Sequence, residues 1–129
     1  DELVIHLRLG DVIEHKKRGE LLKKDFVYII NNYINKYKIK KCTFVTAFNY
    51  HSKDPKYNWE YTENKQNRNV LLLKNFLLNL CEKVNIEIDV KSSVNIDEDF
   101  IYMMKAKYFE YDIEQGFSKF IIDLRNFKN

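Results

Sequence analysis

Short apolar runs alternate with amphipathic stretches along the chain, and this alternation predicts its secondary structure. Runs such as 3–7 (LVIHL) are brief and contain β-branched residues, which is typical of buried strands. Stretches such as 69–84 place apolar residues three and four positions apart, which predicts helices with one buried face. The predicted strands cover residues 3–7, 42–48, 86–90 and 108–111, and the predicted helices cover residues 26–37, 69–84, 97–105 and 116 to about 124.

Polar residues indicate where helices begin and where loops intervene. Asp25 is a suitable N-cap for the helix over residues 26–37. The three acidic residues at 97–99 favour a helix start, because carboxylates interact well with the positive end of a helix dipole. Segments 9–22 and 49–67 are polar, so we expect long loops there.

The element order β-α-β-α-β-α-β-α predicts the α/β fold class. We expect one Rossmann-like domain over residues 1–129, with a doubly wound, mostly parallel sheet covered on both faces. Such sheets bind ligands beyond the carboxyl ends of their strands. Three segments should therefore face a ligand: the turn after Leu7, the loop after Phe48, and residues 114–118.

Composition excludes several classes of protein. With 45% hydrophobic and 32% charged residues, the chain is typical of a soluble globular domain rather than a disordered segment. Its apolar runs are shorter than the roughly 18 residues of a membrane helix, so we expect no membrane segment in this chain. The net charge of +3 suits a phosphate-bearing ligand, but without a basic stripe we expect no nucleic-acid partner.

Cys42 and Cys81 each occur in an apolar stretch. Neither belongs to a CxxC pair or a histidine-rich cluster, so we expect no zinc site. We interpret both as buried, reduced thiols, which favours a reducing compartment such as the cytoplasm. The chain begins directly before a strand, and we therefore expect an excised domain of a longer protein.

The end of the first predicted strand carries the first candidate site, formed by His6, Arg8, Gly10 and Asp11. Arg8 offers a planar fork of donors that suits a diphosphate. Gly10 allows a sharp turn and a close approach of the backbone to a ligand, and Asp11 can orient Arg8 or cap the turn. The alternative interpretation is a surface arginine and aspartate at a strand end.

The start of the last predicted helix carries the second candidate site, formed by Gly116, Phe117 and Ser118. Free amides and the helix dipole make such a start an anion site, and the Ser118 hydroxyl adds a donor. The alternative is an ordinary helix start with a small residue. The chain has 3 glycines, and two of them, Gly10 and Gly116, fall in these two segments, which map to the same edge of the predicted sheet.

Three blocks of the chain resemble the motifs of the GDP-fucose-dependent fucosyltransferases, which comprise the α1,2-, α1,6- and protein O-fucosyltransferases. Residues 5–11 (IHLRLGD) look like the His-x-Arg motif of these enzymes. Residues 97–109 are similar to a second motif, in which an acidic residue opens a helix and a short strand follows. Residues 116–118 look like the Ser-Phe-Ser/Thr segment that ends the pattern, and the order and spacing of the blocks agree.

The resemblance implies a metal-independent, inverting transfer of fucose from GDP-fucose to a glycan or protein hydroxyl, without a cofactor. It implies that this chain is the nucleotide-sugar-binding lobe of a two-lobed GT-B glycosyltransferase, preceded by an N-terminal lobe that carries most of the acceptor site. Arg8 would bind the β-phosphate and stabilise the leaving group, and His6 would contact the nucleotide. Asp99, or Asp97 or Glu98 in another register, would accept hydrogen bonds from guanine. Phe117 and Ser118 would hold the diphosphate.

Two other functions are compatible with the same residues. The first is a non-catalytic nucleotide- or glycan-binding module that kept the fold. Leu9 favours it, because many members of the family carry a second arginine at this position. The second is a nucleic-acid-binding domain, against which the modest charge argues.

Overall fold

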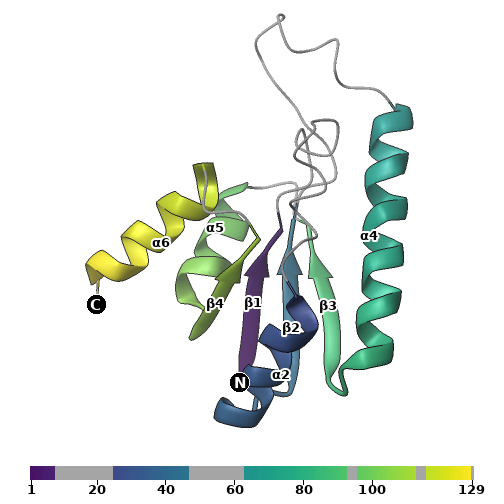
Figure 1. Ribbon diagram of the computed structural model, residues 1–129. Coiled ribbons are helices and arrows are strands. Elements are labelled where there is room, and N and C mark those ends of the chain that lie inside the picture. Colours follow the sequence, from purple (N-terminus) through teal and green to yellow (C-terminus); the bar gives the residue numbers. More distant parts are fainter. Residues whose placement is uncertain (8–24, 47–62, 93–95, 113–115, 129) are drawn as a thin grey trace, which may run out of the picture.

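The computed structural model describes residues 1–7, 25–46, 63–92, 96–112 and 116–128 (Figure 1). Its elements are β1 (Glu2–His6), α2 (Phe26–Tyr37), β2 (Lys41–Val45), α4 (Glu63–Lys83), β3 (Glu87–Lys91), α5 (Ile96–Lys105), β4 (Tyr108–Tyr111) and α6 (Gly116–Lys128). All eight predicted elements are present, and most of their ends agree with the prediction within one residue. Three ends differ: β2 stops at Val45 and not at Phe48, α4 begins at Glu63, six residues before the predicted start at Asn69, and α6 runs to Lys128 and not to about Leu124.

The four strands form one all-parallel sheet in the order β3-β2-β1-β4 (Figure 1). The central strand β1 pairs with strands on both sides, so that Ile5 lies opposite Phe44 of β2 and Glu110 of β4. β3 extends the sheet on the far side of β2, with Ile88 opposite Cys42. The predicted α/β class with a Rossmann-like parallel sheet is therefore confirmed.

Helices α2 and α4 pack on one face of the sheet around an apolar core. Alternate strand residues point to this face, because successive side chains in a strand project to opposite sides. Phe44 lies at its centre, with its ring edge-on to Phe26 of α2 and Phe76 of α4 at centroid distances of 5.9 and 5.6 Å. The other fully or nearly fully buried members of this core are Leu3, Ile5, Leu7, Ile30, Ile39, Cys42, Leu73, Leu80 and Val84.

Helices α5 and α6 pack on the opposite face around a smaller core of Val4, Val45, Met103 and Ile121. This core covers β1, β4 and the part of β2 where Thr43 and Val45 are buried, but Lys41 of β2 and the β3 residues on the same face are charged and at least partly exposed. Lys41 there lies 3.8 Å from Glu87 and 3.6 Å from Asp89, whose side chains are 68% and 58% exposed. The predicted cover on both faces is thus complete for β1 and partial for β2 and β3.

Local signals explain both ends of α2. The Asp25 carboxylate accepts a hydrogen bond from the backbone amide of Tyr28 at 3.1 Å, which confirms the predicted N-cap. Lys38 ends the helix in the left-handed conformation, with φ of 58°, and its amide donates to the Ile34 carbonyl. α2 therefore stops just before β2 begins.

The two cysteines lie in different surroundings. Cys42 is buried under α2 and α4, and burial raises the pKa of its thiol well above the ordinary value. Cys81 is exposed, so the prediction that both are buried is wrong for this residue. Leu73 and Leu80 occupy the buried side of α4, and Cys81 projects away from it. Both are free thiols.

Across the described segments, the helices lack the length and apolar character needed to cross a membrane.

Candidate functional site at the carboxyl edge of β1 and β4

The strand order places a topological switch point at the carboxyl ends of β1 and β4. From β1 the chain proceeds to β2 and β3 on one side, and β4 then lies on the other side of β1. In α/β sheets, the connections leaving two such strands diverge to opposite sides, and ligands bind in the resulting crevice. The two candidate sites of the sequence follow β1 and β4, so the strand order makes them neighbours.

The hydrogen bond between His6 and Ser118 joins these two segments. His6 is the last residue of β1, and its Nδ1 is bonded to the Ser118 hydroxyl in the first turn of α6. The two side chains are 9% and 1% exposed. The backbone of β4 closes the same corner, since the Asp112 amide donates to the His6 carbonyl at 3.2 Å. Residues 112 positions apart in the chain are therefore held together at one strand end.

The helices α5 and α6 both begin at this carboxyl edge, as Figure 1 shows for α6 next to the tips of the strands. Arg125 fixes the other end of α6 to α5. Its Nη1 donates to the carbonyls of Met103 and Ala106 at 2.9 and 2.7 Å, which are free acceptors at the end of α5. Burial lowers the pKa of Arg125, but the guanidinium stays charged at neutral pH. This anchor sets the position of the α6 N-terminus.

The acidic first turn of α5 lies at the same edge. Asp99 is buried, with 8% of its surface exposed, whereas Asp97 and Glu98 are exposed. Glu98 lies 3.6 Å from the ammonium group of Lys91, the last residue of β3, so an ion pair links this turn to the sheet. The predicted acidic helix start is confirmed. A carboxylate at the N-terminus of a helix is stabilised by the dipole.

Two buried polar residues at this edge were missed by sequence reasoning. Thr46 directly follows β2 and is 3% exposed; among the described residues its hydroxyl finds no hydrogen-bond partner. Asp112 directly follows β4 and is 5% exposed. A polar residue immediately after an apolar strand is the signal that could have found both. For Thr46 this signal could not be recognised, because the strand was predicted to continue to Phe48.

Several predicted site residues are only partly covered by the structure. Arg8, Gly10 and Asp11 lie outside the described residues. Gly116 and Phe117 are the first two residues of α6, and the side chain of Phe117 lies outside the described part. The structure thus brings His6 and Ser118 together and places Asp99 at the start of a neighbouring helix.

Metal ligands do not gather in the part of the chain that the structure describes: it contains no group of three or more histidine, cysteine, aspartate or glutamate residues that could hold an ion. The available groups are an imidazole, hydroxyls, carboxylates and the backbone amides of two helix N-termini. Backbone amides at a helix N-terminus can bind an anion.

Comparisons of this chain with protein-family models, with curated proteins and with solved structures gave no match.

Proposed function

We propose that this chain is the nucleotide-sugar-binding lobe of a glycosyltransferase that uses GDP-fucose as donor. The observation that carries the proposal is the His6–Ser118 hydrogen bond at the switch point of a parallel sheet. It connects the segment that precedes Arg8 with the N-terminus of α6. A nucleoside diphosphate needs cations and free amides on both sides, and these two segments can supply them.

Each site residue has a chemical role in the proposal. Arg8 binds the β-phosphate and stabilises the charge that develops on the GDP leaving group as the sugar bond breaks. The backbone amides at the start of α6 bind the diphosphate. The Ser118 hydroxyl is engaged by His6, so we assign these two side chains to positioning β1 against α6. Asp99 accepts hydrogen bonds from guanine, and its carboxylate lies in the first turn of α5, at the positive end of the helix dipole.

The Thr46 hydroxyl adds a further group to the proposed site. Val45 pairs with His6, so Thr46 lies level with Leu7, one residue before Arg8. A buried hydroxyl without a hydrogen bond is unfavourable by about 1–3 kcal/mol, and a bound nucleotide sugar would relieve this penalty. We therefore assign Thr46 a hydrogen bond to an oxygen of the donor.

Titration calorimetry with GDP and ADP tests the proposal on wild type, Arg8→Ala and Lys40→Ala. Lys40 is the matched control, because it is an exposed cation at the amino edge of the sheet. We expect GDP to bind with a dissociation constant of about 1 μM and ADP at least tenfold more weakly. Arg8→Ala should lose at least about tenfold in affinity, because a charged hydrogen bond is worth about 1.5–3 kcal/mol. Lys40→Ala should bind like wild type.

The outcomes separate the parts of the proposal. Absence of GDP binding in wild type contradicts the nucleotide site as a whole. Equal affinity for GDP and ADP contradicts the role of Asp99. Tight GDP binding without transfer of fucose from GDP-fucose by the full-length protein identifies a non-catalytic binding module. In an active enzyme, Arg8→Ala should slow transfer by roughly a hundredfold, since one preorganised charge stabiliser contributes ~3 kcal/mol.

A further inference from the structure

Helix α6 carries apolar residues on two opposite sides. Ile121 belongs to the small core on the sheet and Ser118 is buried beside it, with 0% and 1% of their surface exposed. At 3.6 residues per turn, positions 120 and 127 lie roughly opposite position 118. Phe120 and Phe127 occupy them and are 53% and 88% exposed. A surface helix normally buries one apolar stripe and presents polar residues to water, so the fold leaves this second stripe uncovered.

Neighbouring side chains extend the second stripe into an apolar surface. The ring of Phe100, on α5, stacks on that of Phe120 at a centroid distance of 5.9 Å. Leu124 follows Phe120 by one helical turn and is partly exposed. We call these residues the phenylalanine surface: Phe100, Phe120, Leu124 and Phe127. The nucleotide chemistry proposed above uses none of them.

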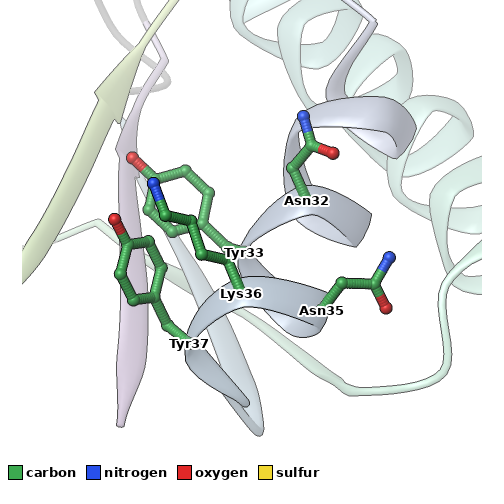
Figure 2. A pocket seen from close by; sticks show the side chains of 5 residues that line it. All are labelled: Asn32, Tyr33, Asn35, Lys36 and Tyr37. Carbon is green, nitrogen blue, oxygen red and sulfur yellow. The ribbon is translucent and has the colours of Figure 1, made fainter.

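The aromatic side chains of α2 differ, because they are covered by one another. Figure 2 shows Tyr33 and Tyr37, which line a pocket, on the same side of this helix. The ring of Tyr37 stacks on that of Tyr108 at a centroid distance of 4.4 Å, and Tyr33 lies 5.6 Å from the same ring. Most of the surface of Phe127, in contrast, is open to water. Exposed apolar patches with a polar rim commonly mark interaction sites.

The phenylalanine surface has the area of a small protein interface. A phenylalanine offers about 200 Å² of surface, so Phe120 and Phe127 together present roughly 280 Å². Phe100 and Leu124 are partly exposed and add to this area. The smaller specific interfaces bury about 600 Å² on each partner, of which about 60%, or roughly 360 Å², is apolar. The available apolar area therefore matches the requirement of a weak dimer.

The spacing of the apolar residues is complementary to itself. In a dimer with a two-fold axis at the level of residue 122, the two α6 helices run antiparallel. Phe120 of one copy then lies opposite Leu124 of the other, because both are two residues from the axis. Phe127 reaches the first turn of the other α6, next to the stacked rings of Phe100 and Phe120. Every apolar side chain of the surface thus meets an apolar neighbour.

The charges beside the stripe favour the same arrangement. Lys119 and Asp123 lie on one flank of α6, where their side chains form an ion pair of 3.4 Å and are 58% and 61% exposed. A two-fold axis brings this flank of both helices together, so in the antiparallel arrangement Lys119 of each copy approaches Asp123 of the other. Parallel helices would place lysine against lysine and aspartate against aspartate. Like charges across an interface are unfavourable, and such flanking charges set helix orientation.

We infer that two copies of the chain associate through the phenylalanine surface as a two-fold dimer with antiparallel α6 helices. The self-complementary spacing and charges identify the partner as a second copy, since an unrelated protein would not require either. The small area predicts a weak dimer, with a dissociation constant of about 10 μM. The inference does not depend on the nucleotide site.

Sedimentation equilibrium of the chain between about 1 and 300 μM tests the inference. The mass should rise from 15.7 kDa towards twice this value. Phe127→Ser should raise the dissociation constant at least about tenfold, because it removes the most exposed apolar side chain of the surface, and this exposure means that the fold does not need it. Leu78→Ser is the matched control: Leu78 is 56% exposed and belongs to α4, on the other side of the molecule, so this variant should dimerise like wild type (Figure 1).

A charge exchange tests the antiparallel arrangement at low salt. Asp123→Lys should raise the dissociation constant by about threefold to tenfold, because lysines then face one another at both ends of the helix pair. The double variant Lys119→Asp/Asp123→Lys should recover the affinity of wild type, since opposite charges meet again. Dilution of the ¹⁵N-labelled chain should shift the amides of residues 119–127 more than those of α4.

Four results would overturn the inference. They are a chain that stays monomeric at about 300 μM, an affinity that Phe127→Ser leaves unchanged, a double charge variant as weak as Asp123→Lys, and dilution shifts centred away from α5 and α6. Vesicles of phosphatidylcholine and phosphatidylglycerol are tested in parallel. If the monomer binds them and Phe127→Ser abolishes this binding, the surface contacts a membrane and the inference is wrong. GDP binding reports on the proposed function alone.

Discussion

The two faces of the sheet differ in what they bury. The face under α2 and α4 buries an apolar core that centres on Phe44. The face under α5 and α6 buries polar groups beside its small apolar core, among them His6, Thr43 and Ser118. An apolar core contributes stability in proportion to the area that it removes from water, whereas a buried polar group needs a partner to be tolerated. The comparison indicates that the face under α2 and α4 contributes most of the stability of the fold. The face under α5 and α6 holds polar side chains such as His6 and Ser118 in place.

Strand β2 allows this comparison within one segment, because Phe44 and Thr43 are adjacent and project to opposite faces. Phe44→Ala should lower the free energy of unfolding by about 3–5 kcal/mol, the usual loss for a buried phenylalanine. Thr43→Ala should lower it by about 1 kcal/mol, because it removes the hydrogen bond that Thr43 donates to Glu2. Urea unfolding followed by circular dichroism measures both. Equal losses would mean that the two faces contribute alike.

Sequence reasoning recovered the stabilising face better than the polar one. The helical spacing of 69–84 and the run at 3–7 follow from burial, which acts on every residue of an element and leaves a periodic signal. The charged half of the other face was not foreseen. Glu87 and Asp89 alternate with Ile88 and Val90, which is the pattern of a strand with one solvated face, but the chain order alone suggested cover on both.

The candidate site was predictable only in part, because some of its features leave a local signal in the sequence and others depend on the order of the strands. Gly116 and Ser118 were recognised because a helix start has a local signature. The contact between His6 and Ser118 depends on β1 lying next to β4, and no local pattern encodes the order of strands. Thr46 was missed because the apolar run continues past the point where β2 ends.

Arg125, which anchors α6 to α5, offers the next test of the face under α5 and α6. Arg125→Ala should lower the free energy of unfolding by about 2 kcal/mol, because hydrogen bonds from a charged group contribute about 1.5–3 kcal/mol and this group is partly exposed. Arg125→Lys should recover part of the loss, since an ammonium group cannot reach several carbonyls with a planar fork. Lys119→Ala is the control on the same helix, where an exposed ion pair with Asp123 contributes less than about 0.5 kcal/mol. An Arg125→Ala variant as stable as the control would show that α6 is held by its apolar side alone.

The pair of His6 and Ser118 should contribute less than the anchor. Ser118→Ala leaves the His6 ring without this hydrogen bond and should cost about 1–2 kcal/mol. A double-mutant cycle with His6→Leu isolates the interaction, because the double variant removes both partners and should cost less than the sum of the single changes. Urea unfolding of the four proteins gives the coupling energy. Additive losses would show that the hydrogen bond contributes nothing to joining β1 and α6.

The smallest expected change in the free energy of unfolding is that of a Thr46 variant. The same variant should show the largest difference between its effect on stability and its effect on ligand affinity. Thr46→Val replaces a buried hydroxyl that lacks a hydrogen bond within the described residues, so the free energy of unfolding should stay the same or rise by up to about 1 kcal/mol. The affinity for GDP-fucose should nevertheless fall by about threefold to tenfold, since a neutral hydrogen bond is worth roughly 0.5–1.5 kcal/mol. Thr43→Val is the matched control: it removes a hydroxyl that does have a partner, so it should lose stability and keep its affinity. A Thr46→Val variant that loses stability in the absence of ligand would reveal a structural role for the hydroxyl. Opposite changes in stability and affinity are expected only if the polar edge is arranged for a ligand rather than for the fold.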